Sequence, residues 1–282
     1  YTRPMIDTLR EPPLAGAGRE GVAAKIVARN LRKTYQGRRG PVHAVLDFSL
    51  EVQEGEFLCL VGPSGCGKST FLRMVAGLVP PSDGEVAVLG RGRTHGQPLT
   101  SIVFQEYAIF PWKTVRENVG FGLQMRAVPR RERDEVVDHW LAKVGLRRFA
   151  DAFPRQLSGG MKQRVAIARA FANDPEVLLM DEPLGALDAQ TRIVLQQELL
   201  RLWEEDRKTV LYVTHSLEEA VLLGDRVVLM TAHPGTPKAE YRIDFPRPRG
   251  LELIGTPEFS RTTYAIWRAL QEEVVRAMEA EA

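Results

Sequence analysis

The 282-residue sequence contains little that would place it across a membrane, in an oxidising compartment or on a nucleic acid. It has two cysteines, Cys59 and Cys66, so we expect free thiols in a reducing compartment and not a disulfide framework. No apolar run approaches the roughly 20 residues that span a bilayer, and no basic start followed by an apolar stretch indicates a secretory signal. The formal net charge of +2 argues against a nucleic-acid partner.

The composition and the apolar pattern describe a folded α/β protein. With 44% hydrophobic and 26% charged residues, the chain can bury a sizeable core, in one large domain or two smaller ones. Short apolar runs predict strands at 26–27, 42–50, 57–61, 85–89, 101–104, 177–180, 210–213 and 226–230. Helices are predicted up to about residue 77, within 114–145, over 158–173 and over 189–205. Such interleaving is typical of an α/β core with a parallel sheet.

The most specific motif is a glycine-rich loop between a predicted strand and a predicted helix, a context that disfavours a chance turn. It fits the phosphate-binding pattern G-x-x-x-x-G-K-[ST] and comprises Gly62, Pro63, Ser64, Gly65, Cys66, Gly67, Lys68, Ser69 and Thr70. Glycines let backbone N–H groups turn towards an anion, and the helix start adds partial positive charge. We expect Lys68 to reach the β- and γ-phosphates and the Ser69 hydroxyl to hold Mg²⁺. The Cys66 thiol, at a variable position of the pattern, is given no chemical role.

A second motif is the apolar strand that ends in Asp181 and Glu182. It places two carboxylates at the carboxyl edge of the sheet, where ligands bind in such folds. Asp181 would orient Mg²⁺ through water, and Glu182 would be the general base that polarises the attacking water. Two solvated acids at a strand end are the alternative explanation, and the upstream P-loop makes it the weaker one.

A third motif, Leu157-Ser-Gly-Gly-Met-Lys-Gln163, precedes a predicted helix, and its Ser158 lies 23 residues before Asp181. Ser158 can cap that helix, and Gly159 and Gly160 expose backbone N–H groups, which together make a second anion site. Because the P-loop already holds one triphosphate, the second site must serve another nucleotide. An ordinary capped helix is the alternative.

With these motifs in this order, the chain resembles the ATP-binding cassette (ABC) ATPases. Their signature reads LSGGQ, and Met161 stands here in place of the glutamine. The resemblance implies ATP and Mg²⁺ as cofactors and a second copy of the chain as partner. Ser158 and Gly160 would then complete the site of the other copy, so that two copies sandwich two ATP molecules as a two-fold pair.

Four further residues match the family pattern. Tyr35 resembles the aromatic residue that stacks on adenine, with a strand aromatic in the core as the alternative. Gln105, at a strand end, resembles the Q-loop glutamine that binds Mg²⁺ and water. Asp188 resembles the D-loop aspartate, and it can equally be an N-cap of the next helix. His215, 34 residues after Asp181, resembles the switch histidine that contacts the γ-phosphate.

The resemblance covers roughly residues 22–231 and implies the domain organisation. A P-loop, RecA-like core with a small antiparallel β-subdomain would take 22–105 and 159–231, with a helical subdomain inserted at about 106–158. Thr114 and Glu117 fit a capping box and predict helix there independently. Residues 1–21 are expected to be a tail and 232–282 a C-terminal extension. In the extension we predict one amphipathic helix packed on the core through Phe259, Tyr264, Ile266, Trp267, Leu270 and Val274.

A separate ATPase cassette without a membrane span fits an importer best, because in importers the ATPase and the transmembrane subunits are commonly different chains. Only 52 residues separate Gln105 from Ser158, without the long insertions of chromosome-organising relatives. The expected activity is ATP hydrolysis coupled to transport. The expected partners are transmembrane permease subunits and, indirectly, a substrate-binding protein, at the cytoplasmic face of the plasma membrane. A soluble ABC ATPase not coupled to transport is the alternative.

Two weaker signals narrow the importer type. The segments 110–115, 244–249 and 257–259 resemble the nitrate, sulfonate, taurine and bicarbonate importers, which take up small anions. That group also includes importers of heterocyclic vitamin precursors, a second possibility for the cargo. Generic loop packing of Pro111 and Trp112, with a solvated C-terminal extension, is the alternative explanation.

Overall fold

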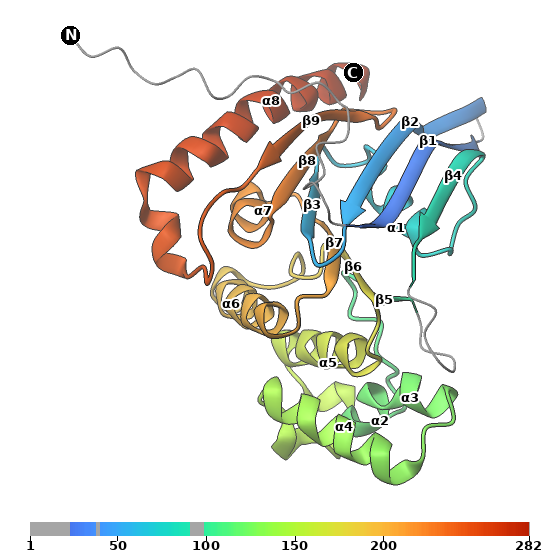
Figure 1. Cartoon of the computed structure of the whole chain (residues 1–282), viewed down its shortest axis with the longest axis vertical. Helices are drawn as coiled ribbons and strands as arrows, with labels where there is room; N and C mark the ends of the chain where they lie inside the picture. The colour runs from blue at the N-terminus through green and yellow to red at the C-terminus, as the bar shows by residue number, and fades with distance from the viewer. Residues whose placement is uncertain (1–22, 38–39, 91–98, 282) are drawn as a thin grey trace.

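The computed structural model describes residues 23–37, 40–90 and 99–281 and arranges them as two sheets flanked by helices (Figure 1). A three-stranded sheet contains the N-terminal part, and a six-stranded sheet runs through the centre. A group of helices, α2 to α5, lies at the end drawn at the bottom of the view, and the long helix α8 lies beside β9 near the other end. None of the helices in these ranges is long and apolar enough to cross a membrane.

The central sheet has the strand order β5-β6-β7-β3-β8-β9. Its strands are β3 (Phe57–Val61), β5 (Thr100–Val103), β6 (Val177–Asp181), β7 (Thr209–Val213), β8 (Arg226–Met230) and β9 (Pro237–Arg242). All neighbours except β8 and β9 are parallel. Every residue of β3, β6 and β7 is buried, as expected of parallel strands covered on both faces. The predicted α/β core with a parallel sheet is therefore confirmed.

The last strand, β9, is not predicted by the sequence. It pairs antiparallel with β8 at the edge of the sheet, and its residues are mostly half-buried. Its sequence PKAEYR begins with proline, which a sheet tolerates at an edge but not at its centre. The segment after residue 231 therefore contributes a strand to the central sheet.

The small sheet has the order β2-β1-β4, with β1 (Ala24–Gly37), β2 (Gly40–Gln53) and β4 (Asp83–Val88) all antiparallel. Strands β1 and β2 are longer than the predicted runs 26–27 and 42–50, because only one face of each is apolar and the polar residues of the other face interrupt the apolar runs. The apolar face packs on α1 (Lys68–Val75), where the Phe48 and Phe71 ring centroids lie 4.3 Å apart.

The helical part contains α2 (Val115–Val119), α3 (Phe121–Met125), α4 (Arg130–Lys143) and α5 (Gly159–Ala172). The capping box is confirmed: the Glu117 N–H donates to Thr114 Oγ1 at 3.2 Å, and the Thr114 N–H donates to Glu117 Oε2 at 2.7 Å. Gly145, in the left-handed region at φ 68°, follows the end of α4 as predicted. Helices α6 (Ala189–Asp206) and α7 (Leu217–Leu223) lie against the central sheet (Figure 1).

The predicted C-terminal helix is α8 (Pro257–Glu281), and its inner face is only partly the expected one. Phe259, Ile266 and Leu270 are buried in the core, and Val274 is partly buried against it. Tyr264 and Trp267, however, are 63% and 44% exposed, so their predicted packing on the core is wrong. The inner face instead contains Glu273, whose carboxylate accepts from the Ala232 N–H at 2.8 Å and pairs with Lys238.

Two arginines before α8 fasten the C-terminal segment to the central sheet. The buried Arg249 guanidinium donates five hydrogen bonds to backbone carbonyls, three of them at the end of α7: Val221, Leu222 and Gly224. Burial lowers the pKa of Arg249 to about 10, which leaves it charged at neutral pH. Arg247 pairs with Asp225 at 2.8 Å and lies over the Trp203 ring. These residues belong to the 244–249 segment that the sequence singled out.

We expect Arg249→Ala to lower the free energy of unfolding by about 2–4 kcal/mol, because it leaves helix-end carbonyls buried without donors. Urea denaturation followed by circular dichroism would measure the change. Arg242→Ala is the matched control: Arg242 is exposed and pairs with the exposed Asp244, so its loss should change stability by no more than about 0.5 kcal/mol. An equal loss in the two variants would contradict the anchoring role of Arg249.

Candidate functional site

The glycine-rich loop joins the end of β3 to the start of α1 at the carboxyl edge of the central sheet (Figure 1). Gly65 and Gly67 have φ of 74° and 103°, in the left-handed region that favours glycine. A Cβ on Gly67 would lie 2.4 Å from the Ala44 carbonyl oxygen, so no larger residue fits between the loop and β2. The pattern therefore has the backbone that a phosphate cradle needs.

Lys68 is folded back over this loop. Its Nζ donates to the carbonyl oxygens of Gly62 and Pro63, both at 2.8 Å, and the residue is 5% exposed. It also donates weakly to Cys66 Sγ at 3.9 Å, so the ammonium group is held at the loop itself. Burial raises the pKa of the neighbouring Cys66 thiol, which agrees with giving that thiol no chemistry.

Ser69 and Asp181 meet across the start of α1 and the end of β6. The Ser69 hydroxyl donates to Asp181 Oδ1 at 2.6 Å, and Arg73 lies 3.8 Å from Asp181 Oδ2. Asp181 is buried, so its oxygens are held in place. Hydroxyl and carboxylate oxygens are the hard ligands that Mg²⁺ takes alongside phosphate and water, and these two residues fit that ion.

Glu182 and His215 form the adjacent pair. His215 Nδ1 lies 2.9 Å from Glu182 Oε2, and Glu182 has a left-handed backbone, φ 45°. Such a conformation is costly for a residue with a side chain and is often found at functional sites. The Gln105 amide nitrogen and Glu182 Oε2 lie 3.5 and 3.6 Å from the position that a Cβ on Gly185 would take. The Glu182 carboxylate therefore lies next to the His215 ring and close to the Gln105 amide.

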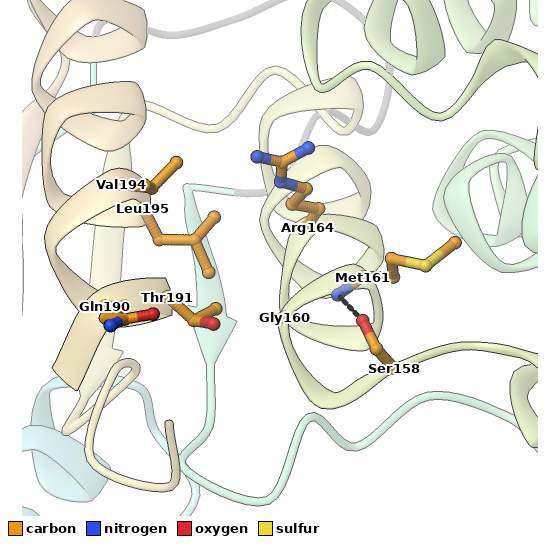
Figure 2. A pocket seen from close by; sticks show the side chains of 8 residues that line it. All are labelled: Ser158, Gly160, Met161, Arg164, Gln190, Thr191, Val194 and Leu195. Atoms are coloured by element: carbon orange, nitrogen blue, oxygen red, sulfur yellow. Dashed lines mark hydrogen bonds between the residues drawn. The ribbon is translucent and has the colours of Figure 1, made fainter. Parts of the chain in front are cut away.

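The signature residues lie at the start of α5, facing α6 (Figure 2). Ser158 caps α5 by accepting from the Met161 N–H at 3.3 Å. A Cβ on Gly160 would lie 2.6 Å from Thr191 Cγ2, so glycine permits the close approach of the two helices. A Cβ on Gly159 would lie 2.9 Å from the Tyr107 hydroxyl.

Between the two helices is a cavity of about 360 Å³, lined by Ser158, Gly160, Met161, Arg164, Gln190, Thr191, Val194 and Leu195. Asp188 caps α6 by accepting from the Thr191 N–H at 2.9 Å, and this bond lowers the pKa of Asp188. The N-cap role of Asp188 is therefore observed, and its D-loop role stays a prediction.

The predicted site residues thus form two groups. The first contains Lys68, Ser69, Asp181, Glu182, His215 and Gln105, and the second contains Ser158, Gly159, Gly160 and Asp188. Among the residues that the structure describes, no hydrogen bond or ion pair joins the two groups.

Tyr35 lies on β1, on the side of the small sheet that carries Ala44. It pairs with Val42, two residues before the Ala44 that touches Gly67, and Lys33 Nζ lies 5.1 Å from the centroid of its ring. The side chain is 40% exposed, which contradicts a place in the core and leaves it free to stack on a ligand.

Sequence reasoning missed the residues that shape the segment after Gln105. Arg169 donates to the Ala108 carbonyl at 2.8 Å, and Tyr107 and Ala108 both have positive φ. The fully buried Asn118 donates to the carbonyls of Phe110, Lys113 and Thr114 and accepts from the Phe110 N–H. It holds the loop that presents Trp112, which is 70% exposed. No motif marks either residue, because each reads as one polar side chain in a helical pattern.

Comparison with known proteins agrees with this geometry. Residues 45–185 match the ABC transporter family. An uncharacterised ABC transporter ATP-binding protein of Methanocaldococcus jannaschii is 47% identical, covering 93% of this chain and 97% of the relative. The nitrate import ATP-binding protein of Synechococcus elongatus is 48% identical over 79% of this chain and 82% of its own length. The taurine import ATP-binding protein of Roseobacter denitrificans is 50% identical over 72% of this chain and 76% of its own length.

A solved dimeric ATP-binding cassette, in a post-hydrolysis state bound to ADP and Pi, superposes with a TM-score of 0.68 at 35% identity. The match covers 78% of this chain and all of that one. The chain therefore belongs to the ABC transporter family and is one of its ATP-binding, ATP-hydrolysing cassettes.

Proposed function

We propose that this cassette energises an importer for a small solute, an anion such as nitrate, sulfonate, taurine or bicarbonate. The hydrolytic part rests on one observation: the P-loop lysine, the Ser69–Asp181 pair and the Glu182–His215 pair gather at one edge of the sheet. The importer part rests on the nitrate and taurine relatives and on the exposed Trp112 in the segment that resembles that group.

In the proposed reaction the loop N–H groups and Lys68 bind the phosphates of ATP. Ser69, Gln105 and Asp181 would hold Mg²⁺, which neutralises phosphate charge when bound. Glu182 accepts a proton from the attacking water, whose oxygen bonds to the γ-phosphorus while the bond to the β-phosphate oxygen breaks. His215, hydrogen-bonded to Glu182, orients that carboxylate and faces the γ-phosphate. Tyr35 stacks on adenine.

The second group of residues would complete the site of another copy. Ser158 and Gly160 form an N–H-rich helix start without a contact to their own P-loop group in the described residues, so their phosphate comes from a partner. The dimeric cassette with ADP and Pi supports this arrangement. ATP would close the pair, and loss of the γ-phosphate would open it.

The surface around Trp112 would bind the permease. Asn118 fixes the loop beneath Trp112, and the Phe110 ring lies 5.7 Å from the Trp112 ring. Arg169 donates to the Ala108 carbonyl, in the segment that follows Gln105, and lies over the Phe110 ring of this loop. A movement of Gln105 would therefore shift the surface around Trp112. The cassette would accordingly sit peripherally on the cytoplasmic face of the membrane, with a binding protein delivering the solute to the permease.

Lys68→Ala should weaken ATP binding at least about tenfold and reduce hydrolysis about 100-fold, because the phosphates lose their only P-loop cation. Fluorescent-nucleotide titration and phosphate release would measure the two effects. Lys143→Ala, which removes an ammonium group paired with Glu205 in the helical part, should leave both near wild type. Normal turnover in Lys68→Ala would refute the assigned role.

Glu182→Gln should still bind ATP, but hydrolysis should fall by about 100-fold or more because the amide cannot accept the proton of water. The variant should therefore accumulate dimers with ATP and Mg²⁺, measured by size-exclusion chromatography with light scattering. The same sample with ADP is the control and should show far fewer dimers. Only monomers in both samples would count against the sandwich.

Trp112→Ala should leave nucleotide affinity unchanged but lower permease-stimulated hydrolysis about tenfold, because exposed tryptophans are frequent interface anchors. The measurement compares ATPase activity of the cassette alone and with its permease in proteoliposomes. Leu78→Ala, at another exposed apolar residue, is the control. Unchanged stimulation in Trp112→Ala would remove this surface from the proposal.

A further inference from the structure

The outer face of α8 presents a row of exposed apolar side chains. Tyr264, Trp267, Val275 and Met278 are 63%, 44%, 47% and 66% exposed. Their spacing places them on one side of the helix, with Gln271 between the two pairs, and we call this row the α8 stripe. The opposite side is buried on the core through Phe259, Ile266 and Leu270. A contiguous exposed apolar row of this kind is typical of an interaction site.

Charged residues flank the stripe in an ordered way. Arg261 and Arg268 lie on the N-terminal half of α8, and Glu272 and Glu279 lie on the C-terminal half, all exposed. The spacings of seven, four and seven residues place the four along one flank of the helix. This flank of α8 therefore carries arginines at one end and glutamates at the other, with Arg261 also paired to Glu258 and Glu272 to Lys238 of the same chain.

This pattern is complementary to itself when one helix is turned end for end. With a two-fold axis between residues 270 and 271, Tyr264 lies level with Met278 of the other copy, and Trp267 with Val275. Arg261 lies level with Glu279 and Arg268 with Glu272, all to within one residue, or about 1.5 Å of helix rise. A two-fold axis across an antiparallel helix pair also brings the same flank of both helices together.

We propose that the α8 stripe is a contact between two copies of this chain, formed by an antiparallel pair of α8 helices. A parallel two-fold pair would place this flank of the two helices on opposite sides of the pair, where its arginines and glutamates could not meet. A membrane surface is the poorer occupant, because helices that lie on anionic lipid carry a basic polar face, whereas this flank has equal numbers of each sign. The contact needs no nucleotide and goes beyond the proposed ATP sandwich.

Cysteine cross-linking without nucleotide tests the geometry. The native Cys59 and Cys66 are buried, so the background is low. Gln271→Cys, on the axis, should form a disulfide-linked dimer, and a mixture of Tyr264→Cys with Met278→Cys should cross-link. Tyr264→Cys alone is the control, because about 13 residues of helix put its two copies about 20 Å apart. We expect at least about tenfold more dimer in the first two samples than in the control. Equal cross-linking in all three would overturn the proposal.

The charge pattern gives a second test, by sedimentation velocity of the full chain. Arg268→Glu should weaken the dimer at least about tenfold by facing Glu272 of the other copy, and Arg268→Glu with Glu272→Arg should restore it. No change, or no restoration, would contradict the pairing.

Flotation with phosphatidylserine vesicles that requires Trp267, without cross-linking, would assign the stripe to lipid and overturn the proposal. In a Lys68→Ala background the cross-links should persist, which separates this contact from failure of the ATP sandwich.

Discussion

The hydrogen bond from the Ser69 hydroxyl to Asp181 Oδ1, 2.6 Å long, joins residues 112 positions apart and locates the whole catalytic edge. It is possible because β3 and β6 are the two parallel neighbours of β7, so their carboxyl ends lie at the same edge of the sheet, on either side of the end of β7. The P-loop follows β3, the two acids end β6, and His215 follows β7. Parallel order alone therefore brings the glycine-rich loop, Asp181, Glu182 and His215 to one edge of the sheet, where we propose the reaction takes place.

The same topology separates the signature from this edge. Ser158 begins α5 next to α6, and its glycines are needed for contacts with Thr191 and Tyr107. In the described residues this N–H-rich helix start has no hydrogen bond to its own P-loop group, and in the proposed dimer it would bind the phosphate of a second molecule. The proposed division of one reaction centre between two copies would thus follow from where a single chain places its parts.

Sequence predicted what local chemistry determines and missed what long-range contacts determine. The P-loop, the acids after β6 and the helix caps Ser158 and Asp188 were predictable from residue types at short spacing. The structure has each of them where expected. Asn118, Arg169 and Arg249 act on carbonyls of segments that no sequence pattern connects to them. The wrong placement of Tyr264 and Trp267 has a further cause: α8 has two apolar faces, and periodicity cannot tell which one meets the core.

The anchoring of α8 bears on how two copies meet. Glu273 is bound to Lys238 on β9 and to the Ala232 N–H, and Arg249 is bound to the end of α7, so α8 is fixed to the central sheet. If two copies pair through α8 as we propose, this fixed helix would keep a defined distance between their sheets, and closure on ATP would be a rearrangement within one assembly. Tethering of this kind raises the effective concentration of the partner site without any new contact to nucleotide. The α8 contact would then fix how the two copies are arranged before ATP binds and closes the pair.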